Sequence, residues 1–403
     1  MKALIITQVF YPDTVATGQV LWDLADYMQQ HECTVTAFTS KYAYEDKSKE
    51  YLSDEIVNGV TIKRLWQTRL GKGNVLYRII DFLSFNISVF FKLLFISSKK
   101  YDVIIGTTVP PFLSFIGVFI SKIKKIPFCY YVMDLQPELS IQSGLIKDKS
   151  ITEKFFTKLG NYSIRNSNKL ISLDQFMTSY LIKRGAKPDN ILTVPIWPLI
   201  DEKYSGDRNS NSFRIENDFG NKIVIMYSGN HAYVHPLDTL LEVANELKDD
   251  SRFLFVFVGW GVRRADVTDF KLKHRLDNIL QLEFQPRNKT HISLASSDIQ
   301  VVVMGNNLVG YTHPNKIYGA LFVGKPILYI GPIPSHISEI LTGLDGNISA
   351  QHGEVTIIIN ELIKFAALQK VDWDEVGQNN IDYCIGNFEP QKLKEKIRSF
   401  IIK

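Results

Sequence analysis

The sequence predicts an α/β protein made of two doubly wound domains, each with a parallel sheet covered by helices on both faces. Two observations predict this class. Short β-branched runs alternate with helical patterns along the whole chain, and at 403 residues the chain is too long for one core. Each such sheet binds ligands at the carboxyl ends of its strands, and we expect the two domains to face a central cleft with these ends.

The first predicted domain covers residues 1–200. Its strands are expected at 2–7, 33–40, 101–107, 127–134, 169–174 and 190–197. Between the first two strands, apolar residues recur at helical spacing within 19–30, which indicates an amphipathic helix. Residues 201–221 are polar and rich in turn formers, and we interpret them as the linker between the domains.

The second predicted domain covers residues 222–380 and repeats the alternation. Its strands are expected at 222–229, 253–259, 278–284, 299–305 and 326–331. Helical patterns separate these strands. Residues 381–403 contain a final amphipathic helix with no strand after it, and we expect this helix to return to the first domain.

Composition and charge exclude several classes of protein. A net charge of +4 is too small to imply a nucleic-acid partner. The three cysteines have no paired spacing and indicate a reducing compartment, so we expect a cytoplasmic protein. No His/Cys cluster has metal spacing, and the Asp372–Asp374 motif is typical of a helix start, so no metal site is predicted.

Residues 61–100 combine positive charge with an apolar run. The segment has a single acid, Asp81, against eight basic residues: Lys63, Arg64, Arg69, Lys72, Arg78, Lys92, Lys99 and Lys100. Polar residues interrupt the apolar run, so it is not expected to span a bilayer. Two interpretations stay open, a buried helix with solvated lysines or a helix lying on an anionic membrane surface, and we favour the second.

Four loops at strand ends of the second domain carry glycines or cations. Gly229, Asn230 and His235 follow the first strand, and two arginines, Arg263 and Arg264, follow the second. The third loop contains Gln285 and Arg287, where the backbone could meet a nucleobase.

In the fourth loop, Lys316 opens a helix directly after Pro314 and Asn315. The helix dipole disfavours a cation there, unless an anion binds beside it. Two arginines at the start of another helix meet the same objection. We therefore predict that Lys316, backed by Arg263 or Arg264, faces a diphosphate.

The first domain offers carboxylates at a strand end. Asp134 and Glu138 follow the strand at 127–134, and Asp134 is the best candidate for orienting or deprotonating an acceptor hydroxyl. The alternative is that Asp134 caps the helix that follows. Gly18 is predicted in a loop that could approach donor or acceptor.

These loops resemble those of glycosyltransferase family 4, which has the GT-B fold of two Rossmann-like domains. The likeness covers essentially the whole chain and is nearest to the bacterial branch that builds O-antigen, capsule and colanic-acid-type polysaccharides. The most specific motifs are "FQPRNKTHISLASSDI" and "HPNKIYGALFVGKPIL". "MDLQPELSIQSGLI" is similar to the family's Asp-Leu-x-Pro-Glu segment.

The resemblance implies transfer of a hexosyl or N-acetylhexosaminyl group from a nucleotide-sugar, with a UDP-sugar favoured, to a polyprenyl-diphosphate-linked saccharide. Retention, no obligatory metal or other cofactor, donor binding by the second domain and acceptor binding by the first are further implications. The protein would work at the inner face of the cytoplasmic membrane, bound through residues 61–100. Asn230 and His235 occupy the places of the family's usual arginine and lysine, and Tyr311 and Gly319 those of its paired glutamates.

Two other functions remain possible from the sequence. A sugar-nucleotide 2-epimerase shares the two-domain architecture, but it has no reason for a basic, Phe-rich surface helix. A non-catalytic nucleotide-sugar-binding partner would explain the missing glutamates, and nucleotide binding without turnover would identify it. We favour the transferase because phosphate-directed cations are present in new positions.

Overall fold

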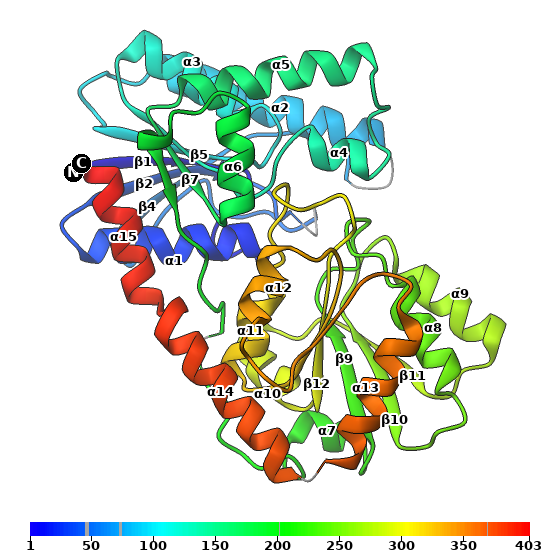
Figure 1. Ribbon diagram of the computed structural model, residues 1–403. Coiled ribbons are helices and arrows are strands. Elements are labelled where there is room, and N and C mark those ends of the chain that lie inside the picture. The colour runs from blue at the N-terminus through cyan, green and yellow to red at the C-terminus, as the bar shows by residue number, and fades with distance from the viewer. Residues whose placement is uncertain (45–47, 72–74, 201, 369) are drawn as a thin grey trace. The chain divides into compact units, whose positions relative to one another are not determined.

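A computed structural model of the protein describes residues 1–44, 48–71, 75–200, 202–368 and 370–403 (Figure 1). The chain divides into two compact units. The first contains residues 1–196, 310–313 and 390–403, and the second contains 197–309 and 314–389. Asp201 of the expected linker and Lys72 of the basic segment lie outside the described residues.

The first unit is built on a sheet with strand order β3-β4-β2-β1-β5-β6-β7-β8 over the described residues. All neighbours are parallel except β3 and β4, a hairpin turning at Asn58 and Gly59. The strands are β1 (Lys2–Ile6), β2 (Thr34–Ser40), β3 (Asp54–Val57), β4 (Val60–Leu65), β5 (Val103–Thr107), β6 (Phe128–Tyr131), β7 (Lys169–Ser172) and β8 (Ile191–Thr193). The helices are α1 (Ala16–Gln30), α2 (Val75–Leu94), α3 (Leu113–Lys124), α4 (Glu138–Gln142), α5 (Ile151–Asn166), α6 (Gln175–Lys183) and α15 (Pro390–Ile402), with a short 3-10 turn at Pro188–Asn190.

The second unit is built on a sheet with strand order β11-β10-β9-β12-β13-β14, parallel throughout the described part. The strands are β9 (Ile223–Ser228), β10 (Phe253–Val258), β11 (Ile279–Leu282), β12 (Ile299–Val303), β13 (Ile327–Ile330) and β14 (Ile348–Ala350). The helices are α7 (Ser212–Glu216), α8 (Asp238–Glu246), α9 (Arg264–His274), α10 (Thr290–Ala295), α11 (Lys316–Phe322), α12 (His336–Leu341), α13 (Val355–Ala367) and α14 (Lys370–Phe388), with a 3-10 turn at Arg287–Lys289. Every residue of β10 and β12 is buried, because helices cover both faces of a parallel sheet.

Residues 202–221 are part of the second unit and not a free linker. They contain α7, whose Phe213 is buried in the core beside β9 and β10. Arg214 donates to the carbonyl of Ser296 (2.8 Å) and to the buried carboxylate of Asp298 (3.3 Å). The polar composition of this segment predicts a linker, but its Arg214 side chain is paired inside the unit.

The C-terminal boundary also differs from the expected one at residue 381. Residues 381–388 continue α14 in the second unit. Earlier in this helix, Gly377 approaches the backbone of Gly324 too closely for any larger side chain. Residues 390–403 belong to the first unit. There α15 bonds α1, since Tyr27 donates to Glu395 (3.0 Å) and Arg398 donates to the carbonyl of His31 (3.0 Å).

Candidate functional site

The candidate site lies at the carboxyl ends of the central strands of the second unit. The strand order reverses between β9 and β12, because β9 continues to β10 on one side and β12 continues to β13 on the other. In doubly wound sheets, ligands bind outside the strand ends at such a switch point. The loop after β9 begins at Gly229, and His235 of that loop donates from Nδ1 to the carbonyl of Val303 at the end of β12 (2.8 Å).

Three glycines let the loops after β9 and β10 approach each other. Gly229, Gly259 and Gly261 have φ angles of 132°, 126° and 150°, a region that other residues rarely adopt. A Cβ at Gly259 would lie 2.2 Å from the carbonyl oxygen of Gly229, and one at Gly261 would lie 2.6 Å from that of His231. Backbone groups therefore form the floor of the site.

Lys316, the first residue of α11, extends over this floor. A Cβ at Gly229 would lie 2.6 Å from its Cε, and its Nζ lies 4.9 Å from the centre of the Tyr227 ring. No carboxylate of the described residues forms an ion pair with this half-buried ammonium group. Burial lowers the pKa of Lys316 to about 8. A partly desolvated cation above an open backbone is suited to an anionic ligand.

Two buried histidines lie beside Lys316. Burial, and secondly the charge of Lys316, lowers the pKa of His231 to about 4 and that of His235 well below its usual value. Neither ring nitrogen of His231 has a hydrogen-bond partner among the described residues. Both imidazoles are therefore neutral, and they add no charge to the site. His231 was not selected from the sequence, since nothing in the loop's sequence signals its burial.

The two arginines are not free, contrary to the prediction that they supply charge to a diphosphate. Arg263 pairs with Asp266 (2.7 Å) and Asp238 (3.0 Å). Arg264 pairs with Glu283 (2.8 Å) and donates to the carbonyl of Gly259 (2.7 Å). These acids neutralise the guanidinium groups and also compensate for the unfavourable helix start. Of the two, Arg264 lies nearer the site, through its bond to Gly259.

The remaining second-unit candidates lie around the same loops. Asn230 is exposed, and its carbonyl accepts from the hydroxyl of Tyr227 (2.8 Å). Gln285 and Arg287 are half-exposed in the loop after β11, where Gln285 donates to the carbonyl of Glu283 (3.1 Å). Pro314 is buried and Asn315 half-buried directly before Lys316, as the sequence requires.

Tyr311 and Gly319, which occupy the places of the family's paired glutamates, lie in different units. Tyr311, predicted to bind the donor, belongs to the first unit, where its ring packs edge-on against Tyr180 (4.8 Å). It is therefore not brought together with Lys316 inside the second unit. A side chain at Gly319 would contact Ile200 and Leu294 (both 3.4 Å), so that position is surrounded by apolar groups unsuited to a carboxylate.

In the first unit, Asp134 follows β6 and is half-buried. It accepts a hydrogen bond from Thr312 (2.7 Å), and burial raises its pKa. Asp134 does not cap the following helix, because the residue before α4 is Pro137. A carboxylate with a raised pKa at a strand end is able to accept a proton from a hydroxyl.

Two first-unit predictions need correction. Glu138 is buried in a pair with Arg184 and accepts from the hydroxyl of Tyr180, so it stabilises the unit and does not wait for an acceptor. Gly18 lies in the first turn of α1 and not in a loop, and a Cβ there would contact the backbone of Phe10 at 3.4 Å. Its small size suits the packing of α1 against the segment that follows β1.

The helix α2 has an exposed apolar stripe. Side chains at intervals of four residues are exposed, with Ile87 at 55% and Phe91 at 53%, and the row continues with Ile79, Leu83 and Phe95. Two of the polar residues that interrupt the apolar run, Asp81 and Asn86, are buried. Asp81 is buried and accepts from Thr68 (2.6 Å) and from the backbone of Leu70 (3.0 Å).

Neighbouring helices extend this apolar surface. Phe90 of α2 lies 6.3 Å from Phe119 of α3, and the two helices run side by side in Figure 1. Phe119 and Ile123 of α3 are also exposed. Over the residues described, no helix has the length and hydrophobicity needed to cross a membrane.

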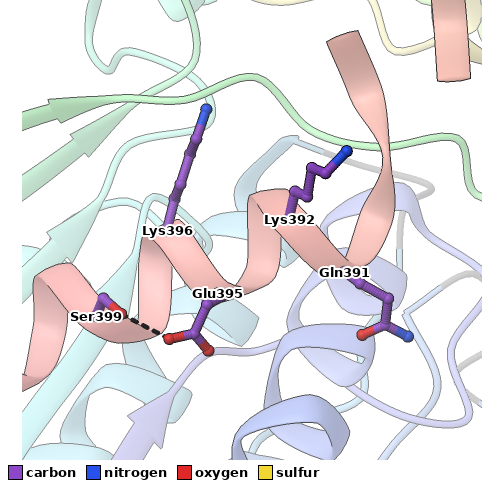
Figure 2. A pocket seen from close by; sticks show the side chains of 5 residues that line it. All are labelled: Gln391, Lys392, Glu395, Lys396 and Ser399. Carbon is purple, nitrogen blue, oxygen red and sulfur yellow. Dashed lines mark hydrogen bonds between the residues drawn. The ribbon is translucent and has the colours of Figure 1, made fainter. Parts of the chain in front are cut away.

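An open hollow along α15 contains none of the predicted site residues. Figure 2 shows its lining, with Ser399 bonded to Glu395 (2.6 Å); the other lining residues are Gln391, Lys392 and Lys396. All five come from one helix face that also carries the bonds to α1. We assign this surface to the packing of α15.

Comparison with known proteins identifies the fold and its relatives. No protein-family model matches the chain. The chain is 23% identical over 334 residues, 80% of its length and 82% of the other's, to WcaI of Escherichia coli (strain K12), assigned by its name to colanic acid biosynthesis as a glycosyl transferase. Its structure is similar to Anabaena HepE in complex with UDP and glucose, with a TM-score of 0.72 and 14% identity over 99% of this chain and 98% of that one. It is also similar to WaaG, a glycosyltransferase involved in lipopolysaccharide biosynthesis, with a TM-score of 0.73 and 13% identity over 99% of both chains.

These comparisons confirm the predicted fold class and the resemblance to glycosyltransferases. The structural likenesses show the fold, and the sequence relationship extends over most of both chains. By sequence relationship and fold together, the chain is a glycosyltransferase of the GT-B fold.

Proposed function

We propose that this enzyme transfers a sugar from a nucleotide-sugar, with UDP as the favoured nucleotide, to a lipid-diphosphate-linked glycan in bacterial surface polysaccharide synthesis. The observation that carries the proposal is Lys316, a half-buried cation over the glycine floor of a switch point, with no acid partner among the described residues. The names of WcaI and WaaG support the polysaccharide context, and the complex of HepE supports UDP. Retention of configuration rests on the family resemblance.

In this proposal Lys316 stabilises the departing diphosphate. A charge pair at about 4 Å is worth on the order of 4 kcal/mol at an effective dielectric near 20, before desolvation. Charge that develops on the leaving group strengthens this contact in the transition state, so it accelerates the reaction and does not only tighten binding. Lys316 thereby takes the charge-neutralising role, and we propose that no metal is obligatory. Activity that persists in excess EDTA would support that part.

Asp134 is proposed to bind the acceptor hydroxyl in the first unit. Burial raises the pKa of this carboxyl, which makes its ionised form a stronger base than an exposed aspartate. Asp134→Asn should leave nucleotide binding intact and depress transfer. Transfer at the wild-type rate would reject the role.

Thermal-shift titration with UDP, GDP, CMP, dTDP and their sugar conjugates tests the donor site. We expect one nucleotide to raise the melting temperature, and Lys316→Ala to abolish that shift. Lys248→Ala is the matched control, because Lys248 is an exposed lysine beyond the far end of α8. A shift of equal size in Lys316→Ala would overturn the assignment of the donor site. Binding without turnover would favour the non-catalytic alternative.

The exposed stripe of α2 is proposed to bind the anionic inner surface of the cytoplasmic membrane. Apolar side chains that pack into a core are buried and need no further partner. The row on α2 is instead exposed along the helix, and a contiguous exposed apolar row indicates a binding partner. Basic residues of the segment 61–100, among them Lys92, Lys99 and Lys100, favour anionic lipid over another apolar partner. This surface would bring the first unit to a lipid-linked acceptor.

A further inference from the structure

Four residues between β12 and α11 belong to the first unit, although the elements that they connect belong to the second. The carbonyl of Tyr311 accepts from the backbone of Leu135 (2.8 Å), directly after Asp134. His313 is buried and bonds through Nδ1 to the carboxylate of Asp174 (2.8 Å). Residues on both sides of Thr312 are therefore anchored to the first unit.

Thr312 is buried between these anchors, and its hydroxyl donates to Oδ1 of Asp134 (2.7 Å). The backbone N–H of Asp134 donates to Thr108 at 3.4 Å, a longer contact that does not involve the carboxylate. The other carboxylate oxygen, Oδ2, has no hydrogen-bond partner among the residues that the structure describes, and Asp134 is only half-buried. The Thr312 hydroxyl thus fixes one oxygen and leaves one available.

We propose that Thr312 is a positioning residue for Asp134, which holds Oδ1 so that Oδ2 accepts the hydrogen bond of the acceptor hydroxyl. The inference rests on the proposed role of Asp134 in transfer. A bond of 2.7 Å from a hydroxyl to a carboxylate is short and directional, and the anchored neighbours restrict the backbone that carries the hydroxyl. Only Pro314 and Asn315 separate this segment from Lys316.

The hydroxyl also affects the charge of Asp134. Burial raises the pKa of this carboxyl, while the bond from Thr312, and secondly the nearby His313, act in the opposite direction. Burial raises the pKa of Tyr130 of β6, and the carboxylates of Glu138 and Asp134 add to that rise, so Tyr130 is a neutral neighbour of Asp134. Removing the hydroxyl should therefore raise the pKa of Asp134 further.

The test measures this titration directly. Full-length protein carrying 13C in the aspartate carboxyl carbons is titrated by NMR, and the Asp134 signal is assigned by its loss in Asp134→Asn. We expect the midpoint to move upward in Thr312→Val and to return to the wild-type value in Thr312→Ser, which keeps the hydroxyl. Thr39→Val is the matched control, because Thr39 is a buried threonine of the same unit that donates to a backbone carbonyl (3.1 Å) and not to a carboxylate.

Parallel thermal shifts with UDP separate this inference from the proposed function. UDP binding is expected to be equal in Thr312→Val and wild type, since Thr312 is not part of the donor floor. An unchanged Asp134 midpoint in Thr312→Val would overturn the positioning role, whatever UDP does. If UDP does not shift the melting temperature of the wild-type protein, the proposed donor is contradicted. The titration of Asp134 still tests the positioning role in that case. If Thr312→Val fails to fold, a Thr312→Ser protein whose Asp134 midpoint departs from wild type overturns the inference.

Discussion

Two cations at helix starts of the second unit have different surroundings. Arg263 precedes α9 and has Asp266 at 2.7 Å and Asp238 at 3.0 Å, whereas Lys316 opens α11 with no carboxylate partner among the residues described. The helices α8 and α2 differ in the same sense. α8 buries apolar side chains such as Leu240 and Val243, whereas α2 exposes Ile87 and Phe91. Charged and apolar side chains that find partners inside the unit are structural. Those left without partners among the residues described indicate a ligand.

The largest expected effect separates the two cations in catalysis. Lys316→Ala should lower turnover by about 100-fold or more, because preorganised charge at a leaving group typically contributes that much. Arg263→Ala should change turnover by less than about 3-fold, because its charge is already neutralised. The measurement is nucleotide release from the nucleotide-sugar that the binding screen selects. Equal losses in both variants would remove the distinction.

The α2 stripe should decide membrane binding. Ile87→Ser with Phe91→Ser should lower partitioning to phosphatidylglycerol-rich vesicles by about 10-fold or more, since each exposed apolar side chain contributes on the order of 1 kcal/mol or more at an interface. Co-sedimentation measures the bound fraction. Ile357→Ser with Ile363→Ser, two exposed isoleucines of α13, is the control and should bind like wild type. Unchanged partitioning of the α2 variant would show that α2 does not carry the interaction.

Lys316 should lower the free energy of unfolding of the ligand-free protein. Its pKa is lowered to about 8, so between about pH 8 and its ordinary value of 10.5 the unfolded chain binds more protons than the folded one. The free energy of unfolding therefore rises with pH across that window, and the full penalty is present below it. Lys316→Met should be more stable than wild type at pH 7, by about 1–3 kcal/mol.

Denaturant unfolding at pH 7 and at pH 10.5 measures this difference, which should shrink at the higher pH. UDP should reverse the order at pH 7 by stabilising only the wild type. A Lys316→Met protein that is less stable than wild type without UDP would mean that an unseen partner balances the charge. Such a partner would bring Lys316 into the same class as Arg263.

The sequence predicts the alternation of strands and helices and the loops after β9 and β10, because these depend on local patterns. The Asn58–Gly59 turn between β3 and β4 is a local signal too, and it was overlooked. Tertiary pairing is not local. Asp238, a partner of Arg263, lies 25 residues upstream on α8, so spacing alone could not show that the arginine is neutralised. The family resemblance places Tyr311 at a donor-binding glutamate, but the chain passes from one unit to the other there.

The α2 stripe illustrates the same limit for surfaces. Both faces of this helix are apolar, with Phe85 and Val89 buried and Ile87 and Phe91 exposed, so periodicity could not tell which face points outward. The buried Asp81 decides it, because its bonds to Thr68 and Leu70 fix the orientation of α2. A polar residue that first argued against a bilayer span is thus the one that turns the apolar stripe to solvent.

The smallest expected effect sharpens the contrast between the cations. Arg263→Gln should change UDP affinity by less than about 3-fold. It should lower the free energy of unfolding by about 0.5–1 kcal/mol, because it removes the two partly exposed ion pairs of Arg263 with Asp238 and Asp266. Isothermal titration and denaturant unfolding measure the two quantities, and Arg252→Gln, another surface arginine paired with an aspartate, is the control for general loss of charge. A fall in UDP affinity as large as that of Lys316→Ala would mean that Arg263 exchanges its two aspartates for the diphosphate. In that case a satisfied ion pair would not exclude a ligand, and only the combination of missing partner and glycine floor at Lys316 would identify the site.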